Sequence, residues 1–211
     1  MARIARIVVP GLPHHVTQRG NRREQVFFEE ADYALYLDML AESAARARCA
    51  IWAYCLMPNH VHFILVPSGE DGLRRTFADL HRRYPAMSMH EHEPQGIFGR
   101  DVMDRWSWMK PICFMPSAMF HSIPCGRDWS SARAHLAGGD NGVVKLAPVL
   151  ERVGESFDED AAYAPLRRAE TIGRPVGDTD WLKMLEKQTG RVLMAQKRGR
   201  RPNKEIKQVS A

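Results

Sequence analysis

The feature that most constrains this chain is a pair of short apolar segments separated by a turn signal. The first segment, residues 50–56 (AIWAYCL), is apolar and aromatic and contains neither Gly nor Pro; the second follows at residues 63–66 (FILV). Between them, Pro58 suits the first central position of a β-turn and Asn59 the second. The pattern predicts a β-hairpin around which the rest of the chain is organised.

Two histidines, His60 and His62, stand at the start of the second predicted strand. Residues two apart on a strand project to the same face, with roughly 7 Å between their backbones. Two neutral imidazoles so placed can hold one divalent metal ion. The alternative is a pair of strand histidines whose nitrogens are satisfied by hydrogen bonds. Chance also produces this spacing, since His90 and His92 share it among the nine histidines.

Candidate elements on either side of the hairpin give the order of an α+β fold. Residues 14–19 form a candidate strand, and residues 29–49 form a helix with an acidic first turn and an apolar, aromatic stripe. Residues 73–83 form a second helix, with Asp71 before it as a candidate cap. The order matches most of a ferredoxin-like β-α-β-β-α-β unit, although no clear final strand follows. We predict an antiparallel sheet with two helices.

The segment that follows the second helix has a different character. Residues 84–128 are rich in Met and Pro, and no helical or strand period persists through them. We interpret this segment as an irregular cap over the core; a metal-binding Met, His and Cys segment is the less favoured alternative.

The carboxyl-terminal part is predicted to be helical and to end in a basic tail. Helices are expected at residues 130–137, 165–170 and 180–189. The tail is broken by Gly and Pro and cannot bury a core, so it should be disordered when free. The predicted organisation is a domain over residues 1–137, a helical extension over residues 138–195 and a basic tail over residues 196–211.

Charge and composition narrow the class of protein. The net charge is +5 and the pI is about 9.2, which raises nucleic acid as a partner. A basic protein without a polyanionic partner is an equally good interpretation of charge alone. No apolar stretch is long enough to span a membrane. The chain has no secretory-type start, and its four cysteines lack CxxC spacing, so we expect a cytoplasmic protein with reduced thiols.

Three groups of basic residues are candidates for contact with DNA phosphates. They are the turn after the first strand, the basic face of the second helix, and the tail, whose Arg-Gly-Arg-Arg-Pro core is similar to minor-groove hooks. For each group the alternative is a solvated surface. The candidates are Arg19, Arg22, Arg23, Arg74, Arg75, Arg82, Arg83, Lys197, Arg198, Arg200 and Arg201.

Two segments taken together resemble one known family. They are residues 11–23 (GLPHHVTQRGNRR) and residues 53–65 (AYCLMPNHVHFIL). Both are similar to the REP-associated tyrosine transposases. These are single-tyrosine members of the HUH nuclease superfamily, in which two histidines flank a hydrophobic residue. The resemblance covers about residues 1–84 and resumes more weakly from Trp129.

The resemblance implies a ferredoxin-like fold with the histidine pair on a central strand. It implies that His60 and His62 are catalytic metal ligands for Mg²⁺ or Mn²⁺. The implied substrate is single-stranded DNA beside a hairpin, which is cut and transferred through a helix-borne tyrosine. The implied roles agree with general chemistry, because a metal ion acts as Lewis acid and template and a tyrosine as covalent nucleophile.

The chain departs from the family pattern between Tyr84 and Trp129. Family members carry there a Gln-Gly-Arg-Phe-like strand and then the helix with the nucleophile. Here residues 98–104 (FGRDVMD) resemble the strand, but no tyrosine lies between Tyr84 and Tyr163. A decayed or frame-shifted copy gives such a segment. Tyr84, at a helix end that Pro85 should stop, is a weak candidate for the nucleophile.

The sequence therefore predicts transposase-like binding of single-stranded DNA, with metal-dependent strand cleavage and transfer impaired by the missing nucleophile segment. The alternative is a DNA- or RNA-binding regulator without cleavage, or a decayed remnant.

Overall fold

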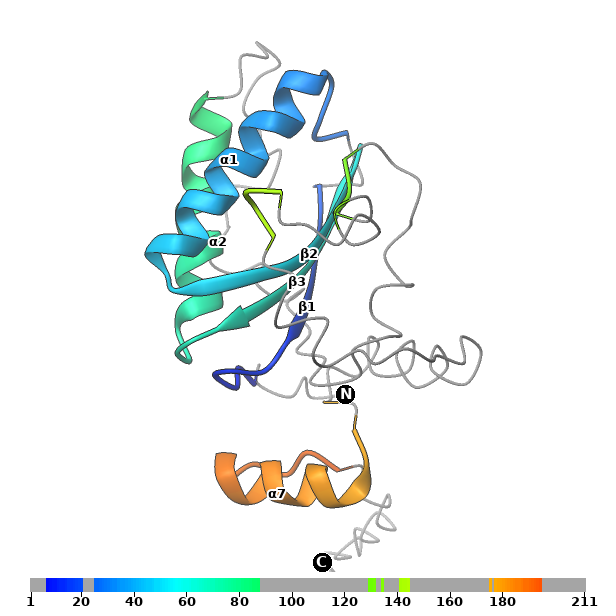
Figure 1. The fold of residues 1–211 in the computed structure, drawn as a ribbon, viewed down its shortest axis with the longest axis vertical. Helices are drawn as coiled ribbons and strands as arrows, with labels where there is room; N and C mark the ends of the chain where they lie inside the picture. Colours follow the sequence, from blue (N-terminus) through cyan, green and yellow to red (C-terminus); the bar gives the residue numbers. More distant parts are fainter. Residues whose placement is uncertain are drawn as a thin grey trace, which may run out of the picture.

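The computed structural model describes residues 7–20, 25–87, 129–131, 134, 141–144, 175 and 177–194. Strands β1 (His14–Arg19), β2 (Cys49–Met57) and β3 (His60–Pro67) form one sheet in the order β1-β3-β2. Helices α1 (Glu30–Arg46) and α2 (Gly72–Met87) lie side by side on one face of this sheet (Figure 1). The helix α7 (Thr179–Thr189) lies apart from both of them.

The sheet has the topology of a split β-α-β unit. Both β1 and β2 pair antiparallel to β3, so they run parallel to each other with β3 between them, and α1 connects them across one face. The order β1-α1-β2-β3-α2 gives the first five elements of the ferredoxin-like unit. The predicted α+β class, with an antiparallel sheet and two helices, is confirmed. Residues 98–104, the candidate for a further strand, lie outside the described residues.

The predicted hairpin is confirmed and is longer than the apolar segments that signalled it. β2 runs to Met57, Pro58 and Asn59 form the turn, and β3 begins at His60, opposite Met57. Backbone pairing at the strand ends does not need apolar side chains, so the polar start of β3 still joins the sheet.

The ends of α1 show where the sequence pattern was right and where it was wrong. At the start, the Asp32 carboxylate accepts hydrogen bonds from the backbone N–H groups of Phe28 and Glu29, at 2.8 and 3.2 Å. At the other end the predicted helix over 29–49 is too long, because α1 stops at Arg46. Arg48 has a left-handed φ of 53°, which turns the chain so that Cys49 begins β2.

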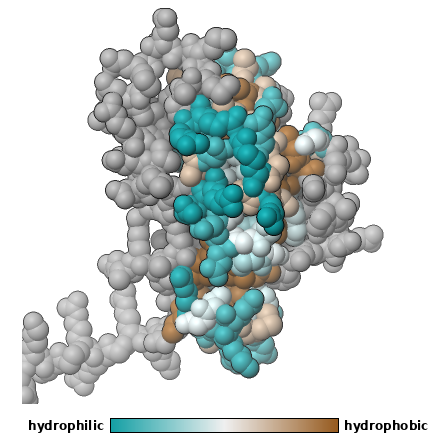
Figure 2. Space-filling view, turned by 90° about the vertical axis from the view of Figure 1, so that its left-hand side faces the viewer, coloured by the Kyte–Doolittle hydropathy of each residue, from teal (hydrophilic) through white to brown (hydrophobic). Residues whose placement is uncertain are grey.

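The core lies between the sheet and the helical layer. Its fully buried members include Tyr36 and Leu40 from α1, Phe77 and Leu80 from α2, and Phe63 from β3. The outward side of the helical layer is largely hydrophilic (Figure 2). This division confirms the predicted stripe on each helix, since one apolar face must be buried against a partner surface.

The second helix also corrects a boundary. Pro85 does not stop α2, which continues to Met87. A proline removes one backbone hydrogen bond and crowds the preceding turn, but in the last turn of a helix little is left to disrupt.

A short segment extends the sheet beyond the outer edge of β2. Leu56 donates its backbone N–H to the Trp129 carbonyl at 2.9 Å, and Ser131 donates its own to the Tyr54 carbonyl at 2.9 Å. The Ser131 hydroxyl also accepts from the Tyr54 N–H at 2.9 Å. Ser130 lies in a β-bridge with Cys55, so the predicted helix over 130–137 does not begin at Ser130. These contacts satisfy polar groups that a bare edge would leave unpaired.

The predicted helix over 180–189 is confirmed as α7. The Asp178 carboxylate caps it by accepting from the backbone N–H groups of Asp180 and Trp181 at 3.0 and 2.8 Å. Gly190 ends it in the left-handed conformation, with φ 64°. The predicted helix over 165–170 and the tail over 196–211 lie outside the described residues.

A small apolar cluster ties the carboxyl-terminal region to the segment before β1. Ile7 and Val9 pack there with Leu185 and Leu193, and all four side chains are buried. No helix in the described residues combines the length and apolar character needed to cross a membrane.

Candidate functional site

Strand β3 places His60 and His62 on the face of the sheet opposite the helical layer. Their neighbours Val61 and Phe63 point into the core and are fully buried. The two imidazole centroids are 5.1 Å apart with their planes at 70°. The predicted same-face arrangement is therefore present.

The neighbouring strand β1 contributes polar residues to the same face. Antiparallel pairing sets Thr17 opposite His62 and Arg19 opposite His60. His15, two residues before Thr17, also projects from this face, and its side chain is buried. The site is thus assembled from two strands that lie far apart in the sequence.

The turn that leads into β3 is fixed by backbone hydrogen bonds from outside the hairpin. The Pro58 carbonyl accepts from the N–H groups of Val26 and Phe27, at 2.7 and 3.2 Å. The Asn59 carbonyl accepts from the N–H of Gly20 at 2.9 Å. His60 therefore starts from a restrained backbone, which favours a defined side-chain position.

Each histidine of the pair has a neighbour at its Nδ1 atom. Nδ1 of His60 lies 2.6 Å from the Asn59 side-chain oxygen. Nδ1 of His62 lies 3.1 Å from Nε2 of His15, and the Thr17 hydroxyl is 3.4 Å from both of these nitrogens. These contacts agree with the alternative of hydrogen-bonded strand histidines. They also leave Nε2 of each ring as the atom that can act as a metal ligand.

Burial and nearby positive charge keep the pair neutral. Burial lowers the pKa of His62 to about 4, with smaller contributions from His60 and Arg19. Burial and then Arg19 lower the pKa of His60 below its usual value. Neutral imidazole is the form that binds metal ions. Arg19, opposite His60, brings a guanidinium cation to the same face.

The donor set fits a divalent ion only in part. Two neutral imidazoles with oriented rings are suitable ligands for a transition-metal ion such as Mn²⁺, and they suit Mg²⁺ less well. Within the described ranges, no group of three or more His, Cys, Asp or Glu side chains could hold a metal ion together. A complete coordination shell would therefore need water, DNA phosphate or other groups in addition to the pair.

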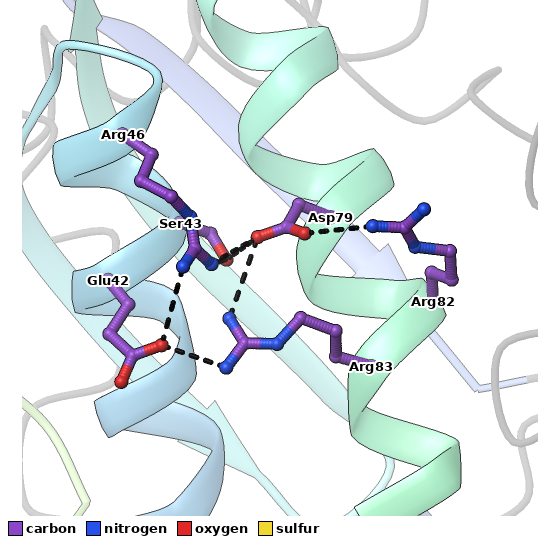
Figure 3. Close-up of polar contacts among 6 residues, drawn as sticks. All are labelled: Glu42, Ser43, Arg46, Asp79, Arg82 and Arg83. Carbon is purple, nitrogen blue, oxygen red and sulfur yellow. Dashed lines mark hydrogen bonds and ion pairs between the residues drawn. The ribbon is translucent and has the colours of Figure 1, made fainter.

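The arginines of α2 lie on the helical layer, opposite the histidine pair. Arg74 pairs with Asp71 at 3.0 Å and Arg82 with Asp79 at 3.3 Å. Arg83 pairs with Glu42 of α1 at 2.8 Å and with Asp79 at 3.6 Å (Figure 3). Arg75 is exposed in the first turn of α2. The contact of these four residues with DNA stays a prediction, and it concerns a different face from the histidine site.

Tyr84 lies in the core on the helical side of the sheet. Its ring is fully buried against Phe27 and Tyr36, with centroids at 6.0 and 5.0 Å. Burial, followed by Asp32 and Tyr33, raises the pKa of its hydroxyl. A buried phenol that is harder to ionise and faces away from His60 and His62 is poorly placed to attack a phosphate bound there.

The other described tyrosines are packed on the same side of the sheet. Tyr33 stacks between Phe27 and Trp129, with centroids at 4.5 and 5.2 Å. Tyr36 is fully buried, and Tyr54 of β2 belongs to the same core cluster. Tyr163 lies outside the described residues.

Of the predicted basic residues outside α2, one lies within the described residues and six lie outside them. Arg19 is described and lies beside His60. Apart from Arg19 and the four arginines of α2, the basic candidates lie outside the described residues: Arg22, Arg23, Lys197, Arg198, Arg200 and Arg201.

The structure adds His15 and Thr17, which the sequence analysis did not single out. Both stand in the candidate strand over 14–19, where His15, Thr17 and Arg19 alternate with His14, Val16 and Gln18. The alternation shows that three polar residues share a face. Their position beside His62 depends on the register between β1 and β3, which the alternation does not give.

Part of the sequence matches a known protein family. Residues 8–93 match the family model described as "Transposase IS200 like". In this part the chain is similar to the IS200-like transposases.

A solved structure described as "Structure of the REP associates tyrosine transposase bound to a REP hairpin" is also similar. It has 14% sequence identity and a TM-score of 0.48, over 75% of this chain and 100% of that one. The comparison with curated proteins finds no match. The family match covers residues 8–93 of the 211 residues.

Proposed function

We propose that this chain binds single-stranded DNA beside a hairpin through the face that carries His60 and His62. One observation carries the proposal: a neutral, oriented histidine pair lies beside the Arg19 guanidinium, within the residues that match the IS200-like transposase model. The Arg19 guanidinium can contact a backbone phosphate. The two imidazoles are neutral, so they do not repel a metal ion.

The pair His60 and His62 is proposed to hold a divalent metal ion, Mn²⁺ or Mg²⁺. When bound there, such an ion supplies Lewis-acid polarisation of a phosphodiester. The chain's own contribution is to fix the two rings through Asn59 and His15, and to hold the phosphate near them through Arg19.

Calorimetric titration of Mn²⁺ tests the metal site. Wild type should bind with measurable heat, and the His60→Ala/His62→Ala double variant should not. The chain offers a matched control, because His90 and His92 have the same spacing. His90→Ala/His92→Ala should bind like wild type. Equal heats from all three proteins would remove the site.

Binding of a fluorescent hairpin with a single-stranded extension tests the DNA surface. Arg19→Ala should weaken binding, and the slope of log K against log salt should fall by about 0.7 for each single-strand phosphate that is no longer neutralised. Lys183→Ala is the matched control, because it removes one positive charge from α7, where Lys183 pairs with Asp180 at 3.1 Å. Equal effects of the two variants would contradict a specific role of Arg19.

The DNA that binds there is either cleaved, as by an active transposase, or only bound. The positions of the tyrosines favour binding without cleavage. Tyr33, Tyr36, Tyr54 and Tyr84, the four in the described residues, belong to or pack against the core on the helical side. None of these four tyrosines lies beside the histidine pair, where a phosphotyrosine mechanism requires its nucleophile. We therefore propose that binding is retained and that cleavage and strand transfer are impaired.

Hairpin strands labelled at the 5′ or the 3′ end distinguish the two functions. After incubation with protein and Mn²⁺, a denaturing gel should show intact DNA and no covalent protein–DNA band. A band that disappears in His60→Ala would contradict this expectation and support an active transposase. Tyr163→Phe would then show whether the tyrosine outside the described residues is the nucleophile.

A further inference from the structure

We propose that His15, with Thr17 beside it, is a positioning residue that fixes the tautomer and the ring orientation of His62. The proposal rests on the proposed function, because it concerns how His62 is presented to a divalent ion. His15 lies on β1, on the same face as His62, and only 4% of its surface is exposed.

The two imidazoles meet edge to edge. Nε2 of His15 and Nδ1 of His62 are 3.1 Å apart, whereas the ring centroids are 5.3 Å apart and the ring planes differ by 14°. The distance between the two centroids exceeds the distance between the two nitrogens by about one centroid-to-nitrogen radius for each ring. The nitrogens therefore face each other along the line that joins the ring centres, as in a direct hydrogen bond.

When both rings are neutral, one proton lies between these two nitrogens. If Nδ1 of His62 donates it, His15 accepts, and Nε2 of His62 keeps a lone pair that can bind a metal ion. If Nε2 of His15 donates it instead, His62 carries its own proton on Nε2, and that atom cannot be a ligand. The role assigned to His15 is therefore that of acceptor.

Strand register explains why the contact is available. Thr17 lies directly opposite His62, and His15 is the diagonal neighbour on the same face. Diagonal neighbours across an antiparallel pair are within reach of long or ring-shaped side chains. The Thr17 hydroxyl, 3.4 Å from each nitrogen, borders the pair and limits the rotation of both rings.

The same arrangement recurs at the other histidine. The Asn59 side-chain oxygen lies 2.6 Å from Nδ1 of His60, so it can accept the proton there and leave Nε2 of His60 available. Both proposed ligands then use Nε2, and both have an acceptor at Nδ1. Partners of this kind orient metal-binding histidines, and their loss typically costs about 10- to 100-fold in metal affinity.

Three substitutions separate the acceptor role of His15 from its bulk. His15→Phe keeps a ring of similar size but removes the acceptor. His15→Gln supplies an amide oxygen that can accept from Nδ1 of His62. Thr17→Val removes the hydroxyl with little change in shape, and its longer contacts predict a smaller effect. Circular dichroism and thermal melting establish which variants are folded.

The first readout is the tautomer of His62, measured without metal by nitrogen-15 NMR of the histidine rings in the full chain. Wild type should carry the proton on Nδ1. His15→Phe should lose this preference, and His15→Gln should keep it. A role limited to packing predicts the same tautomer in all folded variants. A proton on Nε2 in wild type would overturn the proposal.

The second readout is the dissociation constant for Mn²⁺ alone. His15→Phe should weaken binding about tenfold or more, and His15→Gln should restore most of the loss. If wild type binds no Mn²⁺, the proposed metal site is refuted. If wild type binds Mn²⁺ and a folded His15→Phe variant keeps both its affinity and its His62 tautomer, the role of His15 is refuted and the metal site stands.

Discussion

Two substitutions of Tyr84 distinguish its role in the core from a role as nucleophile in DNA cleavage. Its hydroxyl is 3.5 Å from the Val26 carbonyl, which is long for a hydrogen bond, while its ring is fully buried. Tyr84→Phe keeps the ring and should lower the free energy of unfolding by less than about 1 kcal/mol. Tyr84→Ala leaves a cavity in the core and should cost about 3–5 kcal/mol.

Tyr36 provides the matched control. Its hydroxyl lies 3.2 Å from Nε2 of His81, and both side chains are buried. Tyr36→Phe removes that partner from a buried ring nitrogen and should cost about 1–3 kcal/mol, more than Tyr84→Phe. Urea unfolding followed by tryptophan fluorescence measures these differences, provided that the m-values agree.

Tyr84→Phe also tests whether Tyr84 takes part in DNA cleavage. Tyr84 faces the helical layer, so Tyr84→Phe should bind hairpin DNA like wild type. It should also leave any covalent protein–DNA band unchanged. A band that wild type forms and that Tyr84→Phe loses at equal stability would refute the conclusion that Tyr84 is only a core residue.

Three further predictions concern acid, the ion pairs between the helices, and the tail. Burial lowers the pKa of His14 to about 4 and of His81 to about 3. Below pH 6.5 these histidines therefore bind protons in the unfolded chain but not yet in the folded one. As the pH falls from 6.5 to about 4, the free energy of unfolding should decrease by roughly 1.4 kcal/mol per pH unit for each buried histidine. Urea midpoints across this range should fall less steeply in His81→Gln. Asp79 accepts from Ser43 at 2.8 Å and pairs with Arg46, Arg82 and Arg83 (Figure 3). Asp79→Asn should lower the free energy of unfolding by about 1 kcal/mol or more, and Glu42→Gln should lower it by less. The difference between the two variants should be smaller in 1 M salt. Equal losses would contradict the central place of Asp79. Truncation after Ala195 should flatten the salt dependence of DNA binding, by about 0.7 in slope for each phosphate that the tail neutralises; an unchanged slope would mean that the tail does not touch DNA.

Local patterns in the sequence predicted most of the fold around the site. The Pro58–Asn59 turn and the flanking apolar segments indicated the hairpin, and period-two spacing indicated the common face of His60 and His62. The stripes on α1 and α2 indicated the buried side of each helix. These features depend on residues close together in the chain, where spacing determines geometry.

The features that the sequence did not predict depend on contacts between distant segments. The partners of Arg83 include Glu42 of α1, so they are set by helix packing. The contact between His15 and His62 is set by the β1–β3 register. The left-handed Arg48, which shortened α1, is a conformation that the residue type itself does not favour.

The split β-α-β connection has a consequence for how the site comes into being. The β2–β3 hairpin brings His60 and His62 together by local pairing, but His15 lies 47 residues from His62 along the chain. Distant strand pairing forms more slowly than a hairpin because a long loop must close first. The hairpin therefore sets the positions of His60 and His62 relative to each other, and the contact with His15 forms only when β1 pairs with β3.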